Sequence, residues 1–198
     1  LSQRDFERII SPLQRVGANF KINRKKTLPL QIIGSNFTNP IYYFENRGSA
    51  QCKSTIMLAA LNSSGESVIK AKKSRDHTEN IFKYLGIPIK IKKNKNNDEI
   101  KVRGQKAFKS FKYKVPSDPS SCAFFIVLTL LSENCELKVK NVNVNQSRIG
   151  YIKILNKMGA KIKIKNVKKL YGEKQADIVV KSQPYLKKIN CPPSLSSN

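Results

Sequence analysis

Several features are scarce in this 198-residue sequence, and each absence excludes a class of protein. Glycine and proline number only 9 each, which excludes collagen-like and low-complexity chains. No apolar run approaches the ~20 residues that cross a membrane, so we expect no membrane partner. The longest run, Ala123–Leu131, fits a buried core helix. The four cysteines form no CxxC pair and there is one histidine, so we expect buried thiols and no metal site.

The two ends of the sequence also lack familiar features. The first residue is Leu1 rather than Met, and no charged segment followed by an apolar stretch opens the chain. We therefore expect no signal peptide. The chain stops at Asn198 after a proline-rich segment, and we expect it to be part of a longer protein.

Acidic residues are few: 13 Asp and Glu stand against 38 Lys and Arg, which gives a net charge of +25. Such an excess can drive nucleic-acid binding through counterion release. Many lysines, however, alternate with apolar residues, at Ile87–Lys92, Leu137–Lys140 and Lys161–Lys165, as in half-buried strands with lysine on the wet face. Zinc-finger spacing and an aromatic-rich RNA-recognition signature are both absent. We expect solvated surface and no nucleic-acid partner, with a basic nucleic-acid-binding module as the alternative.

Three segments resemble one another, which indicates an internal repeat. Each consists of the end of an amphipathic helix, a glycine that stops the helix, and an alternating strand. The glycines, Gly17, Gly86 and Gly159, lie about 70 residues apart. This spacing is too long for a solenoid repeat and suits a small α/β unit.

The elements between these segments repeat as well. Apolar helices are predicted at Ser49–Leu61 and Pro119–Leu131, and second helices at Ser74–Leu85 and Ser147–Met158. Further strands are predicted at Leu28–Ile33, Ile41–Phe44, Ser67–Lys70, Glu99–Val102, Phe111–Val115, Glu136–Val139 and Asp177–Val180. The repeating order is therefore β, α, β, α, β, β.

The second helices share a serine and an arginine near their starts: Ser74-Arg75, Ser147-Arg148 and, in the first copy, Ser2 with Arg4. Serine is a favoured N-cap, but an arginine in the first turn opposes the helix dipole by about 0.3–1 kcal/mol. A bound anion would reverse that penalty. Each arginine could instead extend into solvent or pair with a nearby carboxylate, but three occurrences favour a common cause.

A second candidate anion site lies at Arg47–Gln51, between a predicted strand and an apolar helix. Gly48 permits the turn, Ser49 suits a cap, and free N–H groups at the helix start can cradle a phosphate. An ordinary capped turn is the alternative interpretation. In the matching segment of the next copy, Pro116–Ser121, we expect Asp118 to cap the helix.

These residues, in this order, resemble the enolpyruvyl transferase family, and within it the synthases that act on shikimate 3-phosphate. The resemblance is carried by Gly48–Ser54, Ser74–Glu79 and Val115–Phe124, and it extends along essentially the whole chain. The Ser-Ala-Gln sequence around Ala50 resembles the glyphosate-tolerant class of these enzymes. The related transferase that acts on a UDP-sugar is the alternative within the same fold.

The resemblance implies an α/β (α+β) fold of two domains, each built from three βαβαββ units, with the active site in the cleft between them. Residues 1–114 would be the later part of the first, phosphate-binding domain, and residues 115–198 the first unit of the second. The family transfers the enolpyruvyl group of phosphoenolpyruvate to the 5-hydroxyl of shikimate 3-phosphate, releases phosphate, and uses no metal or cofactor. We expect a cytoplasmic protein, a monomer at full length, whose partners are these small anionic substrates.

The resemblance also assigns site residues. The positions that match shikimate 3-phosphate ligands are Ser49, Ala50 (through its backbone N–H), Gln51 and Arg75. Those that match phosphoenolpyruvate ligands are Arg4 and Gln51, and planar arginine suits both phosphate and carboxylate. Asp5 follows Arg4 where the family has proline. The catalytic aspartate is expected beyond Asn198, so the chain alone should have no synthase activity.

Overall fold

The structure, a computed structural model, describes residues 3–35, 38–104, 107 and 109–192. Contacts within the chain divide it into two compact units, Leu1–Ser110 and Phe111–Asn198. Each unit has its own sheet and its own apolar core.

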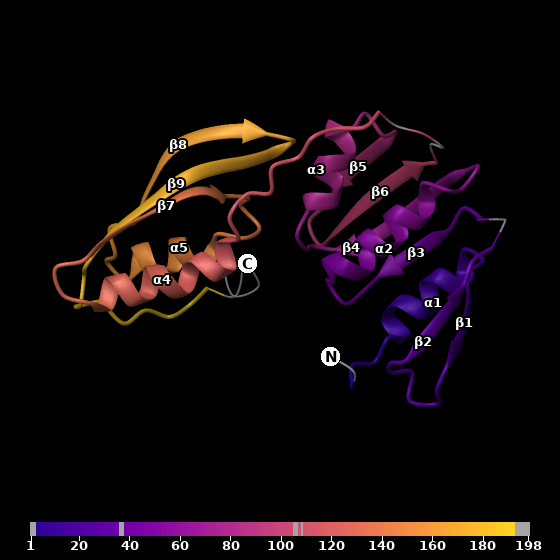
Figure 1. The fold of residues 1–198 in the computed structure, drawn as a ribbon, viewed down its shortest axis with the longest axis horizontal. Coiled ribbons are helices and arrows are strands. Elements are labelled where there is room, and N and C mark those ends of the chain that lie inside the picture. Colours follow the sequence, from indigo (N-terminus) through magenta and orange to yellow (C-terminus); the bar gives the residue numbers. More distant parts are fainter. Residues whose placement is uncertain (1–2, 36–37, 105–106, 108, 193–198) are drawn as a thin grey trace. The chain divides into compact units, whose positions relative to one another are not determined.

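The first unit contains three helices and two sheets (Figure 1). Its elements are α1 (Glu7–Arg15), β1 (Asn19–Ile22), β2 (Leu30–Ile33), β3 (Tyr42–Glu45), α2 (Ala50–Ala60), β4 (Glu66–Lys72), α3 (His77–Tyr84), β5 (Ile89–Lys93) and β6 (Asn97–Arg103). β1 and β2 form an antiparallel pair. The other four strands form a sheet in the order β3-β4-β6-β5, in which only β3 and β4 are parallel.

The core of the first unit lies between α2 and the four-stranded sheet. Ile56 and Met57 of α2 are fully buried, as are Ile69 of β4 and Ile100 of β6, which are register partners on adjacent strands. The alternation of buried and exposed positions along β4 turns its apolar side chains toward the helices. This packing fixes both the start of α2 and the end of β4, where the candidate site lies.

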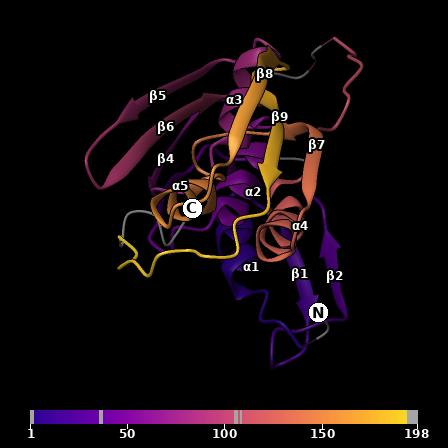
Figure 2. The same cartoon turned by 90° about the vertical axis from the view of Figure 1, so that its left-hand side faces the viewer.

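The second unit repeats this order on a smaller scale (Figure 2). Its elements are α4 (Pro119–Leu131), β7 (Glu136–Asn143), α5 (Gly150–Lys157), β8 (Lys163–Leu170) and β9 (Glu173–Lys181). The strands form an antiparallel sheet in the order β7-β9-β8, and both helices lie on one of its faces. Ile126 and Ile178 are fully buried between the helices and the sheet.

The predicted order β, α, β, α, β, β is confirmed from β3 to β6, and the second unit has the same order without its first strand. The predicted helix stops are also confirmed, because Gly17, Gly86 and Gly159 have φ angles of 109°, 71° and 101°. L side chains rarely adopt that left-handed conformation, whereas glycine adopts it readily.

One predicted strand is wrong. Phe111–Val115 forms no strand, because it connects the two units and reaches no sheet edge. Just after this segment, Ser117 meets β7: its N–H donates to the Asn141 carbonyl oxygen at 2.9 Å, and it forms an isolated parallel bridge with Val142. A strand needs a neighbouring edge, and local alternation alone did not reveal that this one was missing.

Some burial predictions also need correction. α4 buries only one face, through Cys122, Ile126 and Leu130, whereas Phe124 on its other side is 79% exposed. All positions of β8, one of the two edge strands of its sheet, are exposed. Only two of the four thiols are buried; the exposed ones are Cys135 and Cys191. In the part of the chain that the structure describes, no helix is both long enough and apolar enough to span a bilayer.

Candidate functional site

The serine and arginine pairs lie before the helices rather than within their first turns. α3 begins at His77 with Asp76 at the N-cap, and α5 begins at Gly150 with Ile149 at the N-cap. The prediction that serine caps these helices is therefore wrong. Before α3, β4 continues to Lys72 and leaves three residues to connect it to the N-cap Asp76. Ser2 lies outside the described residues.

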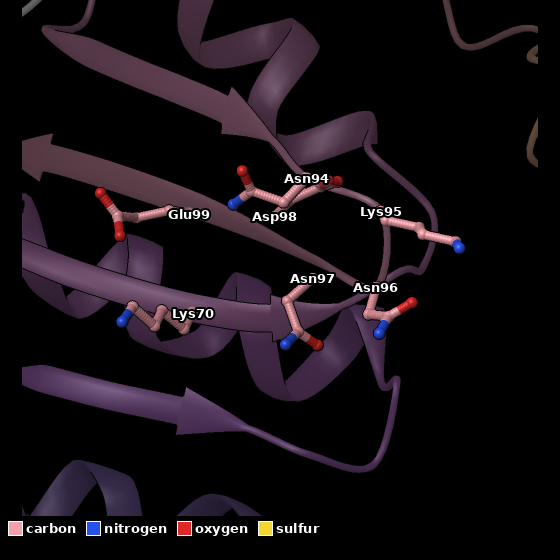
Figure 3. A pocket seen from close by; sticks show the side chains of 7 residues that line it. All are labelled: Lys70, Asn94, Lys95, Asn96, Asn97, Asp98 and Glu99. Carbon is pink, nitrogen blue, oxygen red and sulfur yellow. The ribbon is translucent and has the colours of Figure 1, made fainter.

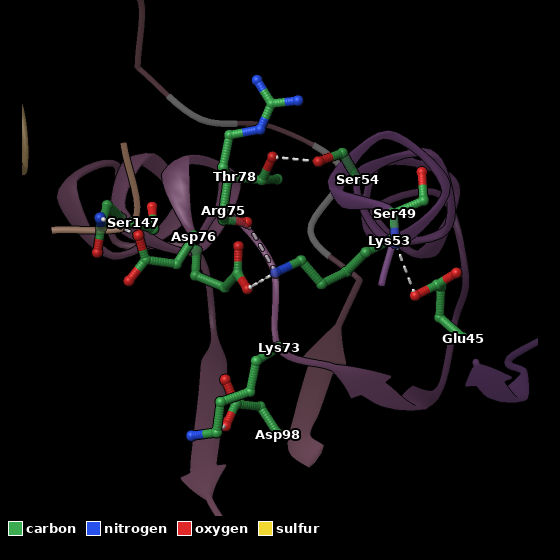
Figure 4. A network of polar contacts seen from close by, with 12 residues as sticks. Glu45, Ser49, Lys53, Ser54, Lys73, Arg75, Asp76, Thr78, Asp98 and Ser147 are labelled. Carbon is green, nitrogen blue, oxygen red and sulfur yellow. Dashed lines mark hydrogen bonds and ion pairs between the residues drawn. The ribbon is translucent and has the colours of Figure 1, made fainter. Parts of the chain in front are cut away.

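Arg75 consequently flanks the start of α3, and its side chain is exposed. The neighbouring carboxylates are engaged elsewhere: Glu79 pairs with Lys53 at 2.6 Å, and Asp76 lies 3.9 Å from Lys93. The guanidinium group of Arg75 makes no ion pair with a described residue (Figure 4). It is therefore available to an anionic ligand.

The start of α2 has the predicted cap. Ser49 is the N-cap, and its hydroxyl oxygen accepts the N–H of Cys52 at 3.3 Å. Gly48 before it has a φ of 70°. The hydroxyl hydrogen of Ser49 can still be donated to a ligand.

The predicted phosphate cradle is smaller than expected. The buried carboxylate of Glu45 accepts the N–H groups of Arg47 and Ser49, each at 3.0 Å. Figure 4 shows the contact with Ser49. The N–H groups of Ala50 and Gln51, the first two of the helix, have no partner among the described residues. These two groups, which a helix leaves unsatisfied at its start, face outward from the first turn.

Two contacts join α2 to the segment that carries Arg75. Nζ of Lys53 donates to the Arg75 carbonyl oxygen at 2.9 Å and lies 2.6 Å from Oε1 of Glu79. The hydroxyl groups of Ser54 and Thr78 are 2.6 Å apart (Figure 4). These contacts bring four predicted residues to one place: Ser49, Ala50, Gln51 and Arg75.

Arg4 is not brought to this place by any contact among the described residues. It lies in the turn before α1, is exposed, and precedes the N-cap Phe6 by two positions. Asp5 accepts the N–H of Glu7 at 2.8 Å, so its carboxylate serves the start of α1.

Sequence reasoning missed Glu45, Lys53 and Glu79, all of which are buried. One signal was present, because Lys53 lies at helical spacing with the apolar positions Ile56 and Met57. A lysine on the buried face of a helix needs a partner. The sequence did not identify that partner, which lies 26 residues away on another helix.

The second unit has an arginine at the equivalent position, but there it is occupied. Arg148 donates to Asp118 at 2.5 Å and to Oγ of Ser120 at 2.9 Å. Asp118 also accepts the N–H of Ser121 at 3.0 Å, which confirms the predicted cap of α4. The pKa of Asp118 is lowered. Burial alone would raise it, but the hydrogen bonds from Ser121 and Ser120 and the charge of Arg148 outweigh that effect. In this unit the chain's own carboxylate fills the position that is open beside Arg75.

A separate hollow of about 330 Å³ lies at the turn between β5 and β6 (Figure 3). It is lined by Lys70 and by residues 94–99, which include Asp98 and Glu99. None of the predicted site residues contributes to it, and its mixed charges favour no anion. The described residues contain no group of three or more His, Cys, Asp or Glu that could hold a metal ion.

Comparison with known proteins gives consistent results. The family described as EPSP synthase (3-phosphoshikimate 1-carboxyvinyltransferase) matches residues 1–192. The 3-phosphoshikimate 1-carboxyvinyltransferase of Petrotoga mobilis is 40% identical over 185 residues, which are 92% of this chain and 42% of the relative. The enzyme of the same name from Ruthia magnifica is 40% identical over 198 residues, 100% of this chain and 44% of the relative. The chain thus spans less than half the length of these relatives.

Solved structures show the same pattern. An EPSP synthase from Acinetobacter baumannii superposes with a TM-score of 0.81 at 35% identity, covering 98% of this chain and 43% of that one. The enolpyruvyl transferase NikO from Streptomyces tendae has a TM-score of 0.65 at 12% identity, covering 92% of this chain and 43% of that one. The second similarity concerns the fold alone.

Proposed function

The chain belongs to the EPSP synthase family, and we propose on that basis that its protein transfers the enolpyruvyl group of phosphoenolpyruvate to the 5-hydroxyl of shikimate 3-phosphate and releases phosphate. The expected α/β fold of the enolpyruvyl transferases is confirmed by the similarity to solved members. The chain is the middle of the enzyme in this proposal, with residues 1–114 in one domain and 115–198 in the other.

The observation that carries the proposal is the guanidinium group of Arg75, which makes no ion pair with a described residue and belongs to a peptide that Lys53 of α2 contacts through the Arg75 carbonyl oxygen. A phosphate there can accept from the N–H groups of Ala50 and Gln51, from the hydroxyl of Ser49 and from the planar guanidinium group. Together these donors supply one full positive charge, the partial positive charge of a helix start and several hydrogen bonds to a phosphate. We assign this position to the phosphate of shikimate 3-phosphate.

Several narrower proposals follow from family membership. Gln51 and Arg4 would contact phosphoenolpyruvate, and the catalytic aspartate would come from sequence beyond Asn198. The Ser-Ala-Gln sequence around Ala50 would place the enzyme in the glyphosate-tolerant class. We further propose that the full-length protein is a cytoplasmic monomer that needs no cofactor, and that this chain alone is inactive.

The test is calorimetric titration of the chain with shikimate 3-phosphate and with shikimate, which lacks the phosphate. We expect measurable preference for the phosphorylated ligand, and we expect Arg75→Ala to weaken its binding about 10- to 100-fold. That range corresponds to about 1.5–3 kcal/mol for hydrogen bonds to a charged group. The matched control is Lys90→Ala, which removes an exposed cation from β5 and should change the dissociation constant less than about twofold.

Other outcomes would contradict the proposal. Equal affinity for shikimate and shikimate 3-phosphate would show that the assigned phosphate site is wrong. Tighter binding of a UDP-sugar would favour the related transferase. Salt-sensitive binding of DNA or RNA that shikimate 3-phosphate does not reduce would favour a nucleic-acid-binding module.

A further inference from the structure

The buried ion pair between Lys53 and Glu79 is unusual in a chain whose other lysines lie mainly on the surface. The two side chains are 2% and 4% exposed, and their charged atoms are 2.6 Å apart. Lys53 also donates to the carbonyl oxygen of Arg75 at 2.9 Å (Figure 4). A single ammonium group therefore connects α2, α3 and the peptide that carries Arg75.

Stability of the fold does not explain this pair. Removing two charges from water carries a large desolvation penalty, and replacing a buried ion pair with apolar side chains of similar volume is often neutral or stabilising. A chain that keeps such a pair gains something other than packing from it. The contact between Lys53 and the Arg75 carbonyl oxygen indicates what the pair provides.

The second unit provides an internal comparison. Counted from the N-caps of the corresponding helices, the position of Lys53 is taken by Cys122 and that of Glu79 by Ile152. Both side chains are buried, at 4% and 3% exposed. The same architecture thus accepts an apolar pair at these positions.

The two units also differ in how their arginines are held. Arg148 is fixed by its own side-chain contacts, because Asp118 and Ser120 accept from it directly. The side chain of Arg75 has no such partner among the described residues, so only its backbone can be held before a ligand arrives. The buried ion pair is present in the unit whose arginine is open and is absent from the unit whose arginine is occupied.

We propose that Lys53 and Glu79 are positioning residues for Arg75. Glu79 holds the ammonium group of Lys53 in place, and Lys53 fixes the Arg75 peptide to α2. Because the peptide of Arg75 is already fixed, only its side chain has to become ordered when the ligand binds. The conformational entropy cost of binding is therefore smaller. The effect on ligand binding that this inference predicts rests on the proposed phosphate site.

The experiment uses the double variant Lys53→Met/Glu79→Leu, which replaces the ion pair with apolar side chains of similar length, as the second unit has apolar side chains at the equivalent positions. Hydrogen exchange followed by mass spectrometry should show residues 74–79 exchanging at least about tenfold faster, with β4 and the body of α2 unchanged. The preference for shikimate 3-phosphate over shikimate should fall about tenfold. Adding Arg75→Ala to the double variant should reduce that preference about tenfold less than Arg75→Ala reduces it in the parent, because the two changes remove the same interaction.

The control is Cys122→Ala/Ile152→Val, a conservative change at the equivalent positions of the second unit. It should leave both the exchange of residues 74–79 and the ligand preference as in the parent. The inference is overturned if the double variant exchanges residues 74–79 at the parent's rates. It is also overturned if the parent prefers the phosphorylated ligand and the double variant prefers it to the same extent. Failure of the double variant to fold would also overturn it, because an apolar pair should be accepted here. If the parent shows no such preference, the proposed function fails, and the exchange rates alone decide whether Lys53 holds the Arg75 peptide.

Discussion

Replacing Glu45 by glutamine should loosen the turn that leads into α2. The carboxylate is 1% exposed and accepts the N–H groups of Arg47 and Ser49, each at 3.0 Å. A glutamine side chain has one oxygen for these two donors, and its amide group would face the second N–H. Each hydrogen bond to a charged group contributes about 1.5–3 kcal/mol. The neutral amide avoids the desolvation of a carboxylate, and Ser49 is only half-buried, so its N–H can reach water. We therefore expect the free energy of unfolding to fall by about 2 kcal/mol.

The assay is urea unfolding followed by circular dichroism, with the slope of the transition checked against the parent. Glu66→Gln is the matched control, because Glu66 is 44% exposed and lies 3.9 Å from Lys101 in a surface ion pair. Such pairs contribute about 0–1 kcal/mol. If Glu45→Gln were no more destabilising than Glu66→Gln, the role assigned to the Glu45 carboxylate would be wrong.

Two further substitutions test the packing and the electrostatics of the fold. Gly104→Ala would place a Cβ 1.8 Å from the Ser63 carbonyl oxygen, so thermal unfolding should show that the free energy of unfolding falls by at least about 1–3 kcal/mol. Gly34→Ala is the control, because a Cβ there has nothing within 4 Å and should change the stability little. Asp118→Ala removes the cap of α4 and should cost about 1 kcal/mol at pH 7. Because the pKa of Asp118 is lowered in the folded chain, its contribution is present above its ordinary pKa of about 4. It is lost as the pH falls through the lower folded pKa, so parent and variant should converge in stability in strong acid.

Features that depend on a few neighbouring residues could be predicted from the sequence. The glycine stops at Gly86 and Gly159 follow from the backbone conformation that ends a helix. The caps at Ser49 and Asp118 follow from side chains that accept N–H groups two or three positions ahead. Because the same local signals recur about every 70 residues, the repeat and the order of its elements were also predictable.

Features that depend on distant partners could not be predicted in the same way. Phe111–Val115 has the composition of a strand, but it reaches no sheet edge. Arg75 lies before α3 because β4 runs to Lys72, and the length of β4 is set by its pairing with β6. The partner of Lys53 depends on how α2 packs against α3, which no pattern in a single sequence specifies.

The repeat shows why the fold alone does not make a phosphate site. Both units place an arginine just before their second helix and a capped helix start opposite it. In the second unit the cap is Asp118, whose carboxylate supplies the negative charge that Arg148 binds. In the first unit the cap is Ser49, which satisfies the helix but carries no charge, so Arg75 is left open. The capping residues differ accordingly: a carboxylate neutralises Arg148, whereas the hydroxyl of Ser49 leaves Arg75 without an ion pair among the described residues. Carboxylate and hydroxyl both cap helices well, so the choice between them changes the charge near the arginine more than it changes the stability of the helix start.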